Sequence, residues 1–246
     1  MCGRFVSASS PDLLAERFGV DVVDVDEFEP SYNVAPREQV MVVRERDDRR
    51  YLSKVRWGLV PSWAKDPSIG DRMINARAET LLTKNAYKRP FAKKRCLIPA
   101  DGFYEWRVVA PPRTPKGRPK KQPVFIHRRD GEPMAFAGLW DVWKVPEGVD
   151  EPPGTRDGWL RTCVIITGEP NELLAPIHDR MPVLLPESAW EAWLDPDNDD
   201  VEQLKRLLVP APSDELELWP VSTVVNNADN KGREVIRPVE EADPDP

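Results

Sequence analysis

The chain has 246 residues, of which 40% are hydrophobic and 31% are charged, and its formal net charge is -7. This composition is ordinary for a globular protein near the upper size of a single domain. It excludes a membrane-spanning helix, since no apolar run approaches the roughly 20 residues required, and the odd number of widely spaced cysteines argues against a disulfide framework.

The first predicted element is a helix over residues 11–18, with Ser10 as its N-cap, Pro11 in its first turn and Gly19 at its end. Strands and helices then alternate irregularly along the chain. Further helices are expected at 76–83, 86–94, 187–194 and 201–208, the first two capped by Asn75 and Asn85. Strands are expected at 40–44, 54–60, 96–99, 123–127, 134–139, 162–167, 181–185 and 216–221.

Strands outnumber helices, so we predict an α+β fold: a single compact domain with a mostly antiparallel, barrel-like sheet and peripheral helices. This domain is expected to cover residues 1–239, followed by an acidic, disordered tail at 240–246. Two charged stretches rich in Pro and Gly, at 109–122 and 145–158, are expected to be surface insertions. The beginning of the chain lacks a basic segment followed by an apolar one, so a signal peptide is not expected and the predicted location is cytoplasmic.

The charge is unevenly distributed. Residues 35–130 contain 24 Lys and Arg against 10 Asp and Glu, a balance of +14, and the remainder contains 11 against 32, a balance of -21. Such asymmetry is typical of a face that binds a polyanion. A solvated loop explains the basic run at 116–121 equally well, but Arg72 and Arg77 lie among apolar and small residues and fit a binding face better.

Cys2 is the most distinctive candidate residue. Initiator methionine is generally removed before a small residue, and removal here would expose an amine with a pKa of about 7.7–8.0 beside a thiol with a pKa of about 8.5. An aldehyde that meets this pair forms an imine, which the thiol closes into a five-membered thiazolidine. Class II glutamine amidotransferases also begin with Cys-Gly, and a small residue at position 2 can be incidental, so the dipeptide alone leaves the chemistry open.

Two further residues could transfer protons. His178 lies in a Pro-bounded loop between acidic and basic neighbours, which favours general acid–base chemistry over a purely structural role. His127 ends an apolar run and is expected to be structural. Glu105 lies between Tyr and Trp, and burial there would raise its pKa and make it a proton donor, but a strand residue that faces outwards is the simpler interpretation.

Another three residues could contact a nucleic acid. Asn75 and Arg77 near a predicted helix start suit an anion or phosphate, although Asn75 is equally explained as a helix cap. Most of the nine tryptophans must belong to the core. Trp63 is different, since it lies on a Pro- and Ser-containing loop beside Lys65 and could stack on a base.

Nine segments of the chain together resemble one family, and they run in order from Cys2 to about Val239, almost the whole length. These segments are MCGRF, YNVAPR, WGLVPSWAKD, INARAET, RCLIPADGFYEW, FAGLW, VIITGEPN, PIHDRMPVLL and WPVSTVVNN. With them the chain is similar to the SOS-response-associated peptidase family. The resemblance implies a compact α+β domain that links its N-terminal cysteine, through a thiazolidine, to the ring-opened sugar of an abasic site in single-stranded DNA or at a junction with duplex.

Roles for individual residues follow from this resemblance. It implies that Cys2 is the nucleophile, that Asn75 orients the N-terminus and the sugar, that Glu105 assists proton transfer, and that His178 assists acid–base steps including release. No Cys or His pair has the spacing of zinc ligands, so a metal site is not expected. The protein is expected to be a monomer without a cofactor and to associate with the nucleoid when bound to DNA. Self-removal of Met1 is compatible with the peptidase in the family's name. The positions expected to contact DNA are Arg4, Pro36, Trp63, Arg77, Thr167 and Arg180.

Two other classes of function remain open from the sequence. A cysteine hydrolase or amidotransferase would also use Cys2, but it would not need the basic stretch. A reader of damaged or modified DNA would need the basic stretch but would form no covalent bond.

Overall fold

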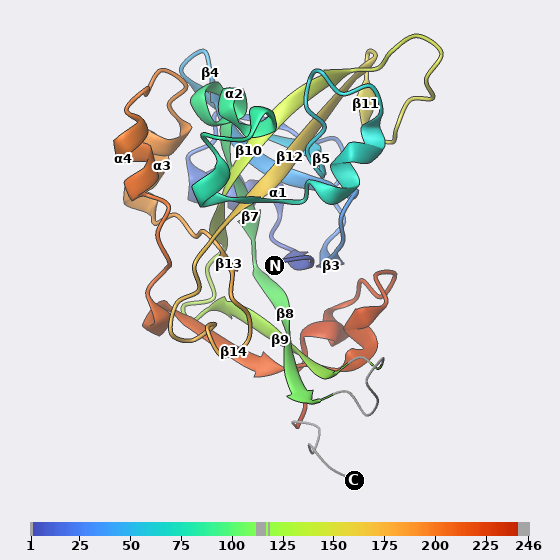
Figure 1. Cartoon of the computed structure of the whole chain (residues 1–246), viewed down its shortest axis with the longest axis vertical. Helices are drawn as coiled ribbons and strands as arrows, with labels where there is room; N and C mark the ends of the chain where they lie inside the picture. The colour runs from blue at the N-terminus through green and yellow to red at the C-terminus, as the bar shows by residue number, and fades with distance from the viewer. Residues whose placement is uncertain (1, 112–116, 118, 241–246) are drawn as a thin grey trace.

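Figure 1 shows the computed structural model, which describes residues 2–111, 117 and 119–240. Its larger sheet has the strand order β11-β12-β10-β7-β4-β5-β2, and β5 also pairs with β12, so five of its strands form a closed ring. We call this ring the barrel; its strands are β4 (Gln39–Arg46), β5 (Arg49–Trp57), β7 (Arg95–Ala100), β10 (Met134–Lys144) and β12 (Trp159–Gly168).

Four short strands extend the barrel. β11 and β2 lie at the two edges of the strand order, and β6 and β13 both pair with the end of β12. The second sheet has the order β14-β9-β8-β1-β3 and lies below the barrel in Figure 1. The short strands are β2 (Val22–Asp24), β6 (Asn75–Arg77), β11 (Thr155–Arg156) and β13 (Met181–Pro182). The second sheet consists of β1 (Phe5–Ser7), β3 (Ser31–Val34), β8 (Gly102–Ala110), β9 (Lys120–Arg128) and β14 (Leu216–Pro220).

Side chains that alternate along the barrel strands form two separate cores. One set fills the barrel and includes Val42, Val55 and Cys163. The intervening set, which includes Val43 and Val164, points to the outside. The helices cover this outer set, as in the packing of α3 on β7. They are α1 (Pro11–Phe18), α2 (Asn85–Lys93), α3 (Glu187–Leu194) and α4 (Val201–Arg206).

The second sheet closes one end of the barrel. Phe5 of β1 contacts Trp57 and Phe136 of the barrel, with ring centroids 5.1 and 5.9 Å apart. The chain therefore begins at the seam between the barrel and the second sheet, at mid-height of the molecule in Figure 1. The described part of the chain contains no helix that is both long and apolar enough to span a membrane.

The predicted α+β class with a barrel-like sheet and peripheral helices is confirmed. The helix at 11–18 has the expected ends, since Ser10 accepts a hydrogen bond from the N–H of Leu13 at 3.3 Å and Gly19 has φ 61°. The prediction of a helix at 76–83 is wrong. Residues 75–77 pair in parallel with β12 and bury Ala76 completely, and only a single 3-10 turn, Ala78–Thr80, follows.

The two expected insertions also differ in their outcome. In the first, strands continue to Ala110 and resume at Lys120, and residues 112–116 and 118 lie outside the described part. The second is not entirely loop, because Thr155 pairs with Leu160 and forms β11. Asn85 is the first residue of α2 and Lys84 holds the cap position, so the expected cap is shifted by one residue. Residues 241–246 of the predicted tail are not described.

Candidate functional site

Cys2 lies three residues before β1 and is fully buried in the core at the seam. Its Sγ donates to the carbonyl oxygen of Arg4 at 3.6 Å. Burial raises the pKa of the Cys2 thiol, and the negative charge of Glu105 raises it further. The thiol is therefore protonated at neutral pH in this arrangement, and its activation requires a proton acceptor.

Asn75 is joined directly to Cys2. Its Nδ2 donates to the carbonyl oxygen of Cys2 at 2.7 Å. The position of Asn75 is set by β6, where it pairs with Ile165 of β12, and this tertiary pairing replaces the helix cap expected from the sequence. Its Oδ1 is buried and accepts no hydrogen bond from the described residues. Asn75 thus fixes the Cys2 peptide and presents a free acceptor beside it.

Glu105 approaches Cys2 from the second sheet. Phe103 of β8 pairs with Phe5 of β1, and the N–H of Tyr104 donates to the carbonyl of Arg4 at 3.0 Å. The same antiparallel register places Glu105 opposite residue 3, next to Cys2. Only 3% of Glu105 is exposed, so the interpretation as an outward-facing strand residue is wrong.

His178 lies in the loop that leads from β12 to β13. Its Nδ1 accepts a hydrogen bond from the N–H of Arg180 at 3.0 Å and lies 2.7 Å from Oδ1 of Asp179. The two partners suit two protonation states: the neutral ring accepts from Arg180, whereas the protonated ring donates to Asp179. This geometry is compatible with a residue that takes up and releases a proton, and 30% of the side chain is exposed.

Two arginines lie together at the end of β12. Arg77 is exposed and pairs with Thr167 along the backbone, and the opposite side of Thr167 pairs with Pro182 of β13. The guanidinium of Arg180 is bonded to the carboxylate of Glu79. Burial lowers the pKa of Arg180, and the nearby charge of Arg77 lowers it further, as expected for two adjacent cations. Two guanidinium groups at one strand end suit a phosphate.

Thr167 itself is fully buried, and its hydroxyl donates to the carbonyl of Ala76 at 3.5 Å. The structure thus brings the ends of β6, β12 and β13 together around this residue. Of the ten residues predicted for the site, those at or near this strand end are Asn75, Arg77, Thr167, His178 and Arg180.

The side chain of Arg4 is bonded to groups within the protein. Its guanidinium donates to Oδ1 of Asn33 at 2.8 Å and to the carbonyls of Val225 and Asn226 at 3.0 and 3.3 Å. These bonds occupy the groups expected to meet DNA and connect the start of the chain to its C-terminal segment. The structure therefore gives Arg4 a bracing role, and a DNA contact stays a prediction for its remaining N–H groups.

Trp63 and Pro36 lie on two neighbouring loops. Trp63 is 60% exposed and lines a surface cavity of about 380 Å³ together with Lys65 and Arg72. Pro36 is half-buried in the turn after β3. The next residue, Arg37, lies 3.6 Å from a carboxylate oxygen of Asp71 in the 3-10 helix Pro67–Arg72, which ties this turn to the Trp63 loop. An exposed indole beside cations is a suitable platform for a nucleobase.

The sequence analysis missed Asn33, which positions this region. Asn33 is fully buried, and its Nδ2 donates to the carbonyls of Val225, Asn227 and Asn230, each at 3.0 Å. The signal was present in the paired segments YNVAPR and STVVNN, but a single sequence does not show that they meet. Within the described residues, no group of three His, Cys, Asp or Glu side chains could hold a metal ion.

Comparisons with known proteins found a matching family model and similar proteins. The model of the family described as SOS response associated peptidase matches residues 1–228. The abasic site processing protein YoqW of Bacillus subtilis is 44% identical over 237 residues, which cover 96% of this chain and 99% of that protein. The abasic site processing protein YedK of Escherichia coli is 32% identical and covers 97% of this chain and 100% of its own length.

Solved structures share the fold. A protein from Bacteroides thetaiotaomicron superimposes with a TM-score of 0.81 at 23% identity, over 97% of this chain and 100% of that chain. A phage-related protein from Bordetella bronchiseptica has a TM-score of 0.65 at 29% identity, over 89% of this chain and 94% of that chain.

Proposed function

Because the chain belongs to the SOS response associated peptidase family, we propose that it processes abasic sites in DNA by forming a covalent bond through Cys2. The observation that carries this proposal is the convergence on Cys2, where Asn75 holds the carbonyl and buried Glu105 lies beside the thiol. Relatives that match almost the full length of the chain are named abasic site processing proteins.

The proposed reaction starts once Met1 has been removed. The free α-amine of Cys2 attacks the aldehyde of the ring-opened abasic sugar, and water leaves as the C=N bond forms. The Cys2 sulfur then bonds to the same carbon while the thiol proton passes to nitrogen, which closes the thiazolidine. The net change is the loss of one water. Sulfur and nitrogen of one residue both bond to the sugar carbon, so the DNA lesion becomes shielded by the protein.

Three side chains support these proton transfers in the proposal. The raised pKa of the Cys2 thiol means that a base must take its proton, and Glu105 lies next to it. The free Oδ1 of Asn75 is an acceptor for the N–H groups of the released amine. His178, which has partners for both of its protonation states, serves the acid–base steps of ring opening and release.

The DNA in this proposal is single-stranded at the lesion, as it is in exposed strands or at a junction with duplex. Arg77 and Arg180 bind the phosphates that flank the abasic sugar, and Thr167 supports the backbone between them. Trp63 and Pro36 contact neighbouring bases. The protein acts as a monomer in the cytoplasm and associates with the nucleoid when it binds DNA.

The decisive experiment is denaturing gel analysis of the protein with an abasic single strand. The mature protein should give a stable adduct whose mass is that of protein without Met1, plus DNA, minus one water. Cys2→Ala should give none, and neither should intact DNA. A comparable adduct yield from Cys2→Ala would refute the role of Cys2.

A protein with uncleavable residues in front of Cys2 keeps the thiol but loses the free amine. It should bind the strand without a stable adduct, because a thiol alone forms only a hemithioacetal that reverts. Stable adduct formation by this extended protein would exclude the thiazolidine. Turnover of amide substrates that depends on Cys2, without any adduct, would instead identify a cysteine hydrolase. Binding that never survives denaturation would identify a reader of damaged DNA.

A further inference from the structure

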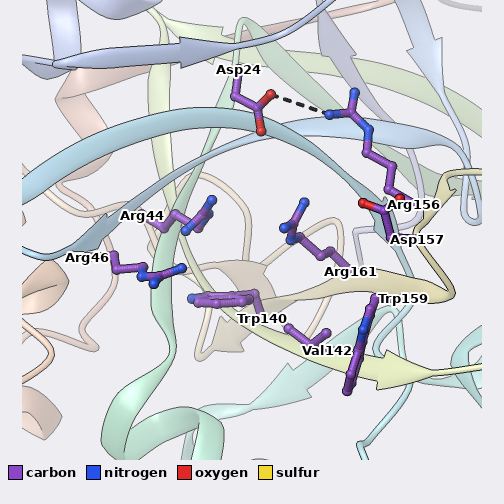
Figure 2. Close-up of a pocket in the computed structure, with 9 residues that line it drawn as sticks. All are labelled: Asp24, Arg44, Arg46, Trp140, Val142, Arg156, Asp157, Trp159 and Arg161. Atoms are coloured by element: carbon purple, nitrogen blue, oxygen red, sulfur yellow. Dashed lines mark hydrogen bonds and ion pairs between the residues drawn. The ribbon is translucent and has the colours of Figure 1, made fainter.

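The end of the barrel away from Cys2 contains a second cavity, of about 490 Å³. We call it the far-end cavity; Figure 2 shows the side chains that line it. Its volume lies within the range of small-molecule binding sites in proteins. The lining residues that matter for the argument are Arg44, Arg46, Trp140, Arg156, Trp159 and Arg161.

The far-end cavity is distinct from the candidate site. Residues 161, 163, 165 and 167 alternate along one face of β12, and the middle two, Cys163 and Ile165, are fully buried in the core of the barrel. Arg161 therefore marks one end of the barrel and Thr167 the other. They lie six positions apart along the strand, which corresponds to about 20 Å.

Two cations in this cavity form no ion pair with a described residue. Arg44 is only 7% exposed, and its guanidinium is packed against the rings of Tyr51 and Trp140, at 5.1 and 5.3 Å. Its Nε donates to the hydroxyl of Ser53 at 3.4 Å. Among the described residues, no carboxylate pairs with Arg44 or with Arg161, and Figure 2 shows the two guanidinium groups on the same side of Trp140.

The acid Asp24 at the rim acts on Arg44, but it is ion-paired with another arginine. Asp24 lies 3.3 Å from Arg156, and Asp26 is bonded to the same guanidinium. Burial and the nearby charge of Arg161 lower the pKa of Arg44, and Asp24 opposes this shift without reversing it. Partly buried cations that repel each other are stabilised by a bound anion, and paired guanidinium groups match a phosphate.

An aromatic surface adjoins these cations. Trp159 is 44% exposed and lies beside Val142 at the wall of the cavity (Figure 2). Trp159 and Arg161 also line a smaller neighbouring cavity of about 130 Å³, to which Lys54 adds another cation. Exposed indole rings next to arginines are the usual means of holding a nucleobase and its phosphate together.

We propose that the far-end cavity binds a nucleotide unit, with its phosphate between Arg44 and Arg161 and its base stacked on Trp159. This site needs no abasic lesion and does not involve Cys2, so it adds a second ligand site to the protein. The unit can belong to a free mononucleotide or to a nucleic-acid strand that continues around the molecule. An acidic peptide fits less well, because its carboxylates supply no aromatic ring to stack on Trp159.

The test measures binding of three probes without a lesion to the full-length protein by calorimetry: inorganic phosphate, dAMP and an undamaged single-stranded 12-mer. Arg161→Ala should lower the affinity for phosphate and for dAMP by about 10-fold or more, which is the loss expected for a charge-assisted hydrogen bond. Trp159→Ala should lower the affinity for dAMP but leave the affinity for phosphate unchanged. Arg206→Ala, an exposed arginine of α4, is the matched control and should change nothing.

The 12-mer distinguishes the two sources of the nucleotide. A strand that uses this site should lose affinity in both Arg161→Ala and Trp159→Ala, whereas a site for free nucleotides should leave the 12-mer unaffected. The proposal is overturned if neither variant alters the affinity of any probe beyond the change in Arg206→Ala. Because every probe lacks a lesion, this failure would leave the Cys2 chemistry untouched, and failure of the crosslinking experiment would not affect this site.

Discussion

The carboxylate of Glu79 should weaken the binding of DNA, because it holds Arg180 at the place where a phosphate is proposed to lie. Glu79 is bonded to Arg180, and Arg77 lies close enough to lower the pKa of the same guanidinium. Replacing Glu79 by Gln keeps the shape of the side chain and removes its charge. We expect this variant to bind undamaged single-stranded DNA more tightly than the wild type does.

The magnitude follows from counterion release. Each phosphate neutralised on a single strand contributes about 0.7 to the slope of log K against log salt. One additional effective contact therefore increases affinity about 5-fold at 0.1 M salt and about 3-fold at 0.2 M. Arg77→Ala should change affinity by the same factors in the opposite direction, and Arg206→Ala should leave both affinity and slope unchanged.

Fluorescence anisotropy with a labelled strand, measured at several salt concentrations, tests this series. Arg180→Ala removes one cation and also releases Glu79, so its loss should exceed that of Arg77→Ala. The double variant Glu79→Gln/Arg180→Ala should recover the part of the loss that is due to Glu79. An unchanged slope in Glu79→Gln, Arg77→Ala and Arg180→Ala alike would place the DNA elsewhere and refute the reasoning.

Three more predictions follow from the site and the core. Glu105→Gln should slow crosslinking by about 10²-fold or more while leaving non-covalent DNA affinity unchanged, as single-turnover gels would show; a rate within a factor of two of the wild type would contradict the role. Asn75→Ala should lower adduct yield and cost about 1 kcal/mol of stability in urea unfolding for the lost bond to Cys2; wild-type yield would contradict the role. Burial raises the pKa of Cys2, Cys96 and Cys163 above that of an unfolded thiol, about 8.5. The free energy of unfolding should therefore be unaffected by these thiols below that pH, and above it should fall by up to about 4 kcal/mol per pH unit. In the variant Cys96→Ala/Cys163→Ala, which keeps only Cys2, it should fall by about 1.4 kcal/mol per pH unit. Urea unfolding between pH 8.5 and 10 measures both slopes, and equal slopes would exclude the buried thiols as the cause.

Local sequence signals predicted the elements whose ends are determined locally. Ser10 and Gly19 bound the first helix because a hydroxyl cap and a residue with positive φ act within a few positions of the chain. The alternating strands of the barrel were also predicted, since the side-chain period of a strand is visible in the sequence. The failures occurred where a distant segment decides the local structure.

Asn75 illustrates such a failure. Its neighbours have good helix propensity, but pairing with Ile165, 90 positions later, makes this segment a strand. The same pairing brings the Asn75 amide to Cys2, so the mistaken helix and the missed contact have one cause. Asn33 was overlooked for a similar reason, since its partners lie at residues 225–230. Some candidate residues were identified by their chemistry and others by the resemblance to the family, while their arrangement depends on contacts that only the folded chain shows.

The hydrogen bonds of Arg4 to the C-terminal segment also have a consequence for biosynthesis. Arg4 is bonded to carbonyls that lie 221 and 222 positions further along the chain, and Asn33 is bonded to the same segment. A ribosome must release nearly the whole polypeptide before these bonds can form. The end of the protein that contains Cys2 is therefore the first part to be synthesised and among the last to be fixed in place. Any truncation before residue 225 would remove the carbonyl groups that hold Arg4 next to β1, so the surroundings of Cys2 are complete only when translation is complete.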